Sequence, residues 1–293
     1  MRKLALVGAL CLVLFFGTGA FIETKIRMVY AVQPEFGMAL ASGWLANTWS
    51  TAGTVNKFGR NEDADTTEDS IADISDLGGP IRCFTNITTS VEVVNVTSDS
   101  DSDAALGVTV EFIDGSWDKQ TEALTLGADA GTGTAQSLLN SGTGVLRINR
   151  AFATSTALTG NIYLHTDTDA GVDGIPDTLL TDIVAVITAG QNQTLQACYT
   201  VPNGMVALLT QFCTTNINKA ANATATFRLR KSVAGAASRV QEVLEIGESI
   251  YQCTEHDPPI VFVEKTDIEL TSVMSGNDGA ATGTFDLLVV PEL

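Results

Sequence analysis

The chain has few basic and few aromatic residues for its length. Of 293 residues, 16 are Lys or Arg against 34 Asp or Glu, and aromatic residues make up only 6%. The shortage of positive charge argues against nucleic-acid binding, because sequence-independent affinity for phosphate backbones depends on Lys and Arg. The formal net charge of −18 also opposes contact with anionic lipid headgroups. We therefore expect no nucleic-acid partner for the folded part of the chain.

The sequence also lacks the motifs that usually carry catalysis. It has two histidines, His165 and His256, and no Gly-x-Ser-x-Gly elbow that would activate a serine. The Gly-Thr-Gly triplets at 131–133 and 142–144 have no Lys after them, so they predict turns and not phosphate loops. Cys253 and His256 could supply two zinc ligands, but no second pair follows to complete a tetrahedral site. We expect a protein that is not an enzyme.

What the sequence does contain is typical of a β protein. Hydrophobic residues reach 45%, the mean hydropathy is +0.19 and there are 26 glycines, which excludes a disordered or fibrous chain. Many short alternating runs are separated by turn residues. At 108–112, for example, Val108, Val110 and Phe112 share one face, and Asp114-Gly115 then turns the chain into a returning run at 120–126.

About a dozen such runs, at turn spacings of about 8–12 residues, predict a sandwich or barrel. No strand–helix alternation is present, which excludes a doubly wound parallel sheet. Residues 239–246 are ambiguous, since their apolar positions also suit a short helix. We predict an all-β fold: an antiparallel, jelly-roll-like β-sandwich over residues 81–293, with two sub-sandwiches split near 165–182 as a variant.

The N-terminus has the pattern of a secretory signal peptide over residues 1–31. Two basic residues precede an apolar run from Leu4 to Phe16, and small residues follow at 17–20. Two other interpretations stay open: a retained membrane anchor, with membrane contact only through residues 1–22, and an over-extended gene start. Without residues 1–31, which carry a net charge of +3, the remaining chain has a net charge of −21.

Residues 32–80 show neither a strand nor a helix period, so we expect an extended arm. Three aromatic residues, Trp44, Trp49 and Phe58, need a surface to lie on. We expect them to form an interface with a neighbouring copy, since aromatic anchors usually carry interface energy. The alternative is that the arm folds back onto its own sandwich.

Two sets of residues could stabilise the body covalently or through a metal. The cysteines Cys83, Cys198, Cys213 and Cys253 permit two disulfides in any of three connectivities, or they are buried free thiols. The alternate carboxylates of Asp167, Asp169 and Asp173, with Asp177 beyond, could hold calcium, which prefers about six to eight oxygen ligands. The same residues also suit an ordinary solvated turn. We expect no cofactor, and bound calcium at this loop is the alternative.

Several stretches resemble a family of tailed-bacteriophage virion proteins, and together they cover most of residues 55–293 with gaps. The similar stretches are Val55 to Asn61, Val110 to Trp117, Leu146 to Ala151, Gln193 to Pro202, Phe227 to Arg230, Glu264 to Ile268 and Phe285 to Val289. The resemblance implies a small β-sandwich component, present in many copies on the capsid surface or in the tail. The signal-like leader and the four cysteines of the body depart from this pattern, and they leave room for an exported relative.

The sequence thus favours a non-enzymatic virion structural protein. It would be capsid-associated (of decoration, cement or head-fibre type) or a tail component, and its partners would be itself and other virion proteins. The alternative is a secreted, carbohydrate- or surface-binding β-sandwich module, stabilised by calcium.

Overall fold

The computed structural model describes most of the chain from Gly53 onward. The described residues are 53–74, 83–84, 91–127, 136–137, 143–154, 158–167, 174–176, 179–218, 224–234, 236–247, 250–276 and 279–292. Among these residues, no helix combines the length and the apolar character that a membrane crossing requires.

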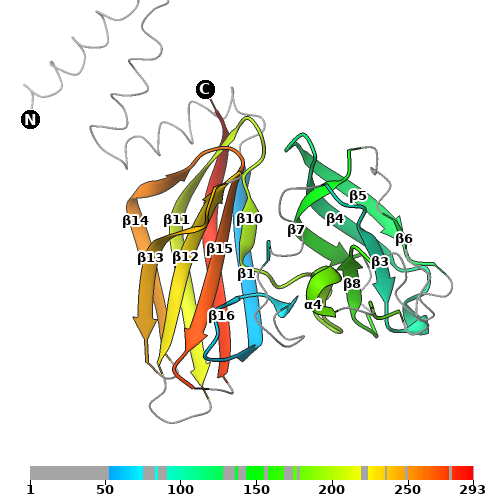
Figure 1. Cartoon of the computed structure of the whole chain (residues 1–293), viewed down its shortest axis with the longest axis horizontal. Coiled ribbons are helices and arrows are strands. Elements are labelled where there is room, and N and C mark those ends of the chain that lie inside the picture. Colours follow the sequence, from blue (N-terminus) through cyan, green and yellow to red (C-terminus); the bar gives the residue numbers. More distant parts are fainter. Residues whose placement is uncertain are drawn as a thin grey trace, which may run out of the picture. The chain divides into compact units, whose positions relative to one another are not determined.

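Eight strands form a two-layered unit, which we call the jelly-roll sandwich (Figure 1). The strands of its first sheet are, in spatial order, β1 (Gly53–Ala64), β16 (Gly279–Pro291), β11 (Met205–Asn218) and β14 (Tyr251–Phe262). Those of its second sheet are β10 (Cys198–Thr200), β15 (Thr266–Met274), β12 (Ala225–Val233) and β13 (Arg239–Ile246), and the short β2 (Asp69–Ser70) also pairs with β15.

The order of these eight strands is that of a jelly roll. Counted along the chain, with β2 set aside, the strands lie in the orders 1-8-3-6 and 2-7-4-5 in the two sheets. The neighbouring strands are antiparallel, including the pairing of β1 with β16, which brings Gly53 opposite Val289. The predicted fold class, an antiparallel jelly-roll-like sandwich, is therefore confirmed.

A second sandwich is built from chain that lies between the first and second strands of the jelly roll, and we call it the inserted sandwich. One of its sheets contains β6 (Gln136–Ser137), β3 (Asn95–Ser98), β8 (Ile162–His165) and β9 (Ile183–Ile187), in that order. The other contains β5 (Lys119–Thr125), β4 (Gly107–Asp114) and β7 (Val145–Ala153). The one-turn helix α4 (Leu179–Asp182) and the 3-10 turn η2 (Asp101–Asp103) lie in its connections.

Each sandwich has its own hydrophobic core. The jelly-roll core is dominated by large aromatic side chains from both sheets, among them Phe212, Phe285 and Phe227. The core of the inserted sandwich is mostly aliphatic, with Phe112 as its one buried aromatic side chain in the described residues. Both follow from strand alternation, because every second side chain points between the sheets.

The boundaries differ from those expected from sequence. The predicted split near 165–182 falls between β8 and β9, which pair with each other, and the change of core falls instead between β9 and β10. Part of the expected arm is also a sandwich strand, since residues 53–64 form β1. Residues 53–64 are extended, as predicted, but they pair with β16 of the same chain. The jelly roll therefore begins before residue 81.

Local predictions agree better with the structure. The expected hairpin is β4 and β5, and the carboxylate of Asp114 closes its turn by accepting hydrogen bonds from the backbone N–H groups of Ser116 (2.8 Å) and Asp118 (3.0 Å). The ambiguous residues 239–246 form strand β13, paired with β12. Strand pairing therefore decides the conformation of a segment whose apolar spacing also suits a helix.

Gly59 in β1 allows two connecting segments to approach the sheet closely. A Cβ atom at Gly59 would lie 1.8 Å from the carbonyl oxygen of Ile71 and 2.4 Å from the backbone nitrogen of Ala197. Both contacts are with backbone, which cannot rotate away as a flexible side chain could. The segments that lead into and out of the inserted sandwich thus pass against β1 at a position that requires glycine.

We predict that Gly59→Ala lowers the free energy of unfolding by about 1–3 kcal/mol, the usual cost of overfilling a closely packed site. The matched control is Gly53→Ala in the same strand, where an added Cβ meets nothing within 4 Å. Urea denaturation of the three proteins measures the difference. Equal stability of the two variants would contradict the close approach at Gly59.

Candidate functional site

The two sheets of the jelly-roll sandwich differ in how their outer faces are covered. In β15 nearly every residue is buried, whereas residues of β16 alternate between buried and half-buried. Alternate residues of a strand point to opposite faces of the sheet. The sheet that contains β15 is therefore covered on both faces at this strand, and the sheet that contains β16 is covered on its inner face only.

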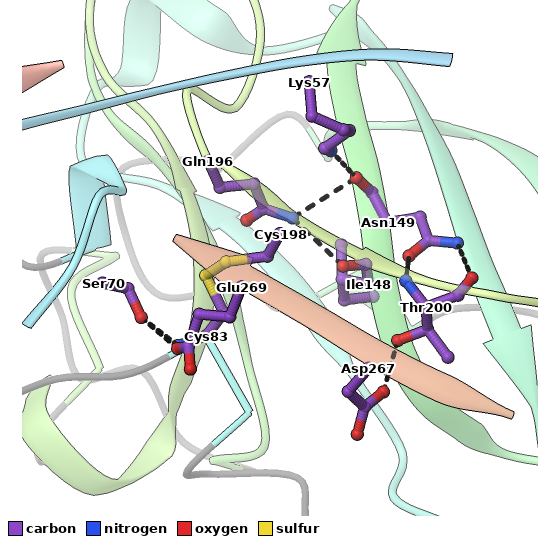
Figure 2. Close-up of a disulfide and its surroundings, with 10 residues drawn as sticks. All are labelled: Lys57, Ser70, Cys83, Ile148, Asn149, Gln196, Cys198, Thr200, Asp267 and Glu269. Carbon is purple, nitrogen blue, oxygen red and sulfur yellow. Dashed lines mark hydrogen bonds between the residues drawn. A yellow bond between two sulfur atoms is a disulfide. The ribbon is translucent and has the colours of Figure 1, made fainter. Parts of the chain in front are cut away.

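The outer face of the covered sheet meets the inserted sandwich through buried polar side chains, which we call the polar seam (Figure 2). Its members are Lys57, Arg147, Asn149, Gln196, Thr200 and Asp267, and all of them except Arg147 are drawn in Figure 2. The strongest contact joins β7 to β15: the Arg147 guanidinium donates from Nε and Nη2 to the Asp267 carboxylate at 2.9–3.1 Å. Removing one partner of such a buried pair usually costs about 3–5 kcal/mol, because the other charge is left uncompensated.

Amide and hydroxyl groups complete the polar seam beside this ion pair. The side chain of Asn149 acts like a strand neighbour of Thr200, because it accepts from the Thr200 N–H (2.8 Å) and donates to the Thr200 carbonyl (3.1 Å). The Thr200 hydroxyl donates to Asp267 (2.6 Å), and Gln196 donates to the carbonyl of Ile148 (3.0 Å). Figure 2 shows these groups converging from β7, β10, β15 and the residues just before β10. The contacts satisfy polar groups that burial would otherwise penalise.

Lys57 is the unusual member of the polar seam. It lies in edge strand β1 with its side chain buried, and its ammonium group donates to the carbonyl of Asn149. Burial, helped by the neighbouring Arg150 cation and opposed by Glu111, lowers the pKa of Lys57 to about 7. A charged amine here is costly because burial removes its hydration.

The connection from β2 is fixed to the covered sheet by a disulfide. Cys83 is bonded to Cys198 of β10, and Glu269 of β15 accepts hydrogen bonds from the Ser70 hydroxyl and from the Cys83 N–H (3.2 Å) (Figure 2). Glu269 and the two sulfurs are the one cluster of candidate metal ligands in the described residues. Because the sulfurs are joined to each other, they are not available as thiolate ligands.

A charged cluster occupies the same face farther along the sheet. Glu68 accepts hydrogen bonds from Arg228 (3.1 Å), Arg230 (2.7 Å) and Thr271 (2.6 Å). Partial burial acts to raise the pKa of Glu68, but the hydrogen bonds and positive charges of these neighbours outweigh it and hold the pKa below its ordinary value. The charges of this face are thus paired within the chain.

The outer face of the other sheet is a regular grid, which we call the open face. Residues directly opposite each other on neighbouring strands point to the same side. The register of β1, β16, β11 and β14 therefore gives four rows: Thr54–Leu288–Leu208–Val261, Asn56–Asp286–Gln211–Glu255, Phe58–Thr284–Cys213–Cys253 and Arg60–Thr282–Thr215–Tyr251.

The open face carries little net charge for so acidic a chain. Its charged residues are Arg60, which pairs with Glu62 beside the grid, Asp286, which accepts from Asn56 (2.6 Å), and Glu255. Two aromatic side chains stand out from it at opposite edges, Phe58 on β1 at 42% exposure and Tyr251 on β14 at 64%. An exposed surface with little charge and with aromatic side chains resembles the core of a protein interface.

A second disulfide joins two neighbouring strands of the open face. Cys213 and Cys253 are directly opposite each other on β11 and β14, with Cα atoms 4.0 Å apart. Together with the first disulfide, this selects one of the three connectivities that the sequence left open. It also ties edge strand β14 to the sheet next to the bulge at residues 256–259.

The other site residues predicted from sequence are only partly described. Of the expected calcium ligands, Asp167 is described, and its backbone carbonyl accepts from the Asn95 side chain (2.9 Å). Asp169, Asp173 and Asp177 lie outside the described residues, so the calcium site stays a prediction. Trp44 and Trp49 also lie outside them, which leaves Phe58 as the described member of the expected interface set.

The run of Asp99, Asp101 and Asp103 has a structural role that the sequence did not suggest. Asp residues that alternate with Ser are typical of a solvated loop, but Asp103 is fully buried and accepts from the backbone N–H groups of Thr159 and Gly160 (both 2.9 Å). Asp99 likewise accepts from the backbone N–H of Asn161 (2.8 Å). These carboxylates connect two loops of the inserted sandwich.

Both histidines take part in internal contacts. His165 is buried in β8, where its Nε2 lies 3.2 Å from the Thr97 hydroxyl, and burial lowers its pKa against the opposing effect of Asp167. His256 stacks on Phe212, with ring centroids 5.9 Å apart, and its Nε2 lies 3.4 Å from Glu242. Cys253, the partner suggested for His256 at a zinc site, is engaged in the second disulfide.

Comparisons with known proteins give no family. No protein-family model and no curated protein matches the chain. Similar solved structures include a mitogen from Yersinia pseudotuberculosis (11% identity, 31% of this chain and 82% of that one, TM-score 0.20) and the module TmCBM61 in complex with β-1,4-galactotriose (12%, 71% and 94%, TM-score 0.20). A third is an empty particle of cowpea mosaic virus (8%, 66% and 78%, TM-score 0.18). TM-scores this low carry no argument about function.

The buried amine of Lys57 predicts a characteristic dependence of stability on pH. Between about pH 7 and about pH 10 the unfolded chain binds a proton at Lys57 that the folded chain has lost, so the wild-type protein gains stability as the pH rises. Lys57→Met lacks this gain. The free energy of unfolding of the wild type should therefore rise, relative to that of Lys57→Met, by roughly 2–4 kcal/mol between these two pH values. Below the lower of them the difference between the two proteins should stay constant.

Denaturation at a series of pH values measures this shift, with Lys231→Met, a half-exposed lysine of β12, as the control. Parallel pH profiles for wild type and Lys57→Met would contradict the lowered pKa.

Proposed function

We propose that the chain is a non-enzymatic structural protein of a virus particle that associates with further copies of itself. It would be a capsid-associated component of decoration, cement or head-fibre type, or a tail component. The resemblance to tailed-bacteriophage virion proteins supports this assignment, and the jelly roll is a scaffold that viral capsid proteins use. Because a fold alone does not define a function, the proposal depends on the surface that this fold presents.

The observation that carries the proposal is the unequal covering of the two sheets. At β15 and β12 one outer face is occupied by the inserted sandwich and by paired charges, while the open face is left exposed with little net charge and with Phe58 and Tyr251 projecting from it. A chain with a net charge of −18 repels its own copies almost everywhere. The sixteen grid residues of the open face include one positive and two negative side chains, a net charge of −1, so this repulsion is weak there.

The chemistry-bearing side chains of the described residues support a structural role as well. The buried ion pair of Arg147 and Asp267 joins two sandwiches, and the cysteines form disulfides. His165 contacts a buried threonine. Each of these groups has a partner that accounts for its position in a building block.

A second candidate is an exported carbohydrate- or surface-binding module. The observation that favours it is the same pair of exposed aromatic rings, because sugar rings can lie against aromatic faces on the surface of a β-sheet. The signal-like leader and the disulfides fit an exported protein. The two candidates predict different occupants for one surface, so they can be separated by experiment.

For the virion function we expect the purified full chain to self-associate reversibly and to co-sediment with virus particles of its source. Sedimentation velocity over a concentration series and mass spectrometry of gradient-purified particles measure the two properties. Genes for a portal, a major capsid protein or a terminase next to its own would agree with this result. A chain that stays monomeric and is missing from particles would contradict the proposal.

For the carbohydrate-binding alternative we expect retention on a glycan array that Phe58→Ala and Tyr251→Ala each abolish. Val243→Ala is the matched control, since Val243 is 50% exposed on β13, outside the open face. Calcium should also raise the melting temperature if the aspartate loop holds the ion. A wild-type chain that binds no glycan on the array would exclude this candidate.

A further inference from the structure

The proposed self-association requires a surface, and the grid of the open face fits a second copy of itself. Two sheets that pack face to face keep their strand directions within about 30° of each other. Consider a two-fold axis that runs parallel to the strands and lies above the open face, between β16 and β11. Rotation about it places the second copy face to face with the first, with its strands in the reverse order. Each of the four rows then lies over the same row of the other copy. Edge strand β1 of one copy then lies over edge strand β14 of the other.

This operation brings complementary side chains together in three of the four rows. Arg60 shares its row with Tyr251, so the guanidinium of one copy lies over the phenol ring of the other, a favourable cation–π arrangement. In the next row, Phe58 lies over the disulfide half Cys253.

Asn56 shares its row with Glu255, so a neutral amide and not a second carboxylate lies opposite Glu255. Every such contact occurs twice, because a two-fold interface uses the same surface on both copies.

The size of the open face is sufficient for a specific dimer. Four strands about 4.8 Å apart and eight residues at about 3.3 Å each cover about 500 Å² on one copy. The two copies together bury on the order of 1,000 Å², which is the threshold for a biological interface and the range of weak, reversible ones. The other candidate occupants fit less well, since a basic partner would find few carboxylates on this surface and an acidic one would be repelled by the rest of the chain.

We propose that two copies of this chain pair through the open face about a two-fold axis that lies along the strands between β16 and β11. This inference rests on the proposed self-association and names its surface. It assigns Phe58 to the interface that the sequence predicted for it, and it adds Arg60, Asn56, Tyr251 and Glu255, which the sequence did not indicate.

Sedimentation velocity of the full chain tests the pairing. Phe58→Asp and Tyr251→Arg should each raise the dissociation constant of the dimer by about tenfold or more, whereas Val243→Asp on β13 should leave it unchanged. Thermal melting of each variant, within a few degrees of wild type, confirms that the fold is intact. Equal effects of Val243→Asp and the two open-face variants would overturn the proposed surface.

The geometry of the axis is tested by mixing two variants. Arg60→Glu and Tyr251→Arg should each dimerise poorly alone, and their equimolar mixture should recover dimers because the new opposite charges meet across the axis. Failure to recover overturns the proposed axis. If the open-face variants all associate as strongly as the wild type, the proposed surface is wrong, and the chain self-associates through another surface. A wild-type chain that is monomeric at every concentration contradicts the proposed function itself.

Discussion

The buried ion pair between Arg147 and Asp267 is the contact on which the arrangement of the two sandwiches depends. It crosses from the inserted sandwich to the outer face of a jelly-roll sheet, where both side chains are removed from water. Such a pair contributes stability only when its geometry is good and its remaining groups are hydrogen-bonded. Thr200 and the carbonyl of Leu146 supply those hydrogen bonds to the carboxylate and to the guanidinium.

Covering one sheet determines what the other can do. The inserted sandwich lies between β1 and β10 in the chain. It therefore packs near these two strands, and it contacts β15 on the outer face of the sheet. The opposite sheet keeps one solvent-facing surface. Its low net charge, in a chain of net charge −18, is the reason why we propose that surface for contact between copies.

The fold class could be predicted from sequence because strand alternation is a local signal. The runs around Phe112 and Phe285 show it directly, and so does the turn at Asp114. The division into sandwiches could not be predicted, since β1 pairs with β16 across more than two hundred residues and no local pattern names that partner. The burial of Asp103 was missed for the same reason: its hydrogen-bond donors come from a loop distant in sequence.

The sequence by itself determined that this is an acidic, all-β chain, that its four body cysteines could form two disulfides, and that Phe58 is a candidate contact residue. Only the tertiary structure decided which cysteines pair, which sheet is covered and which residues surround Phe58. The physical reason is that side-chain alternation assigns each residue to a face of its own strand. What lies against that face depends on strand register and on the insertion, and both arise from contacts between distant parts of the chain.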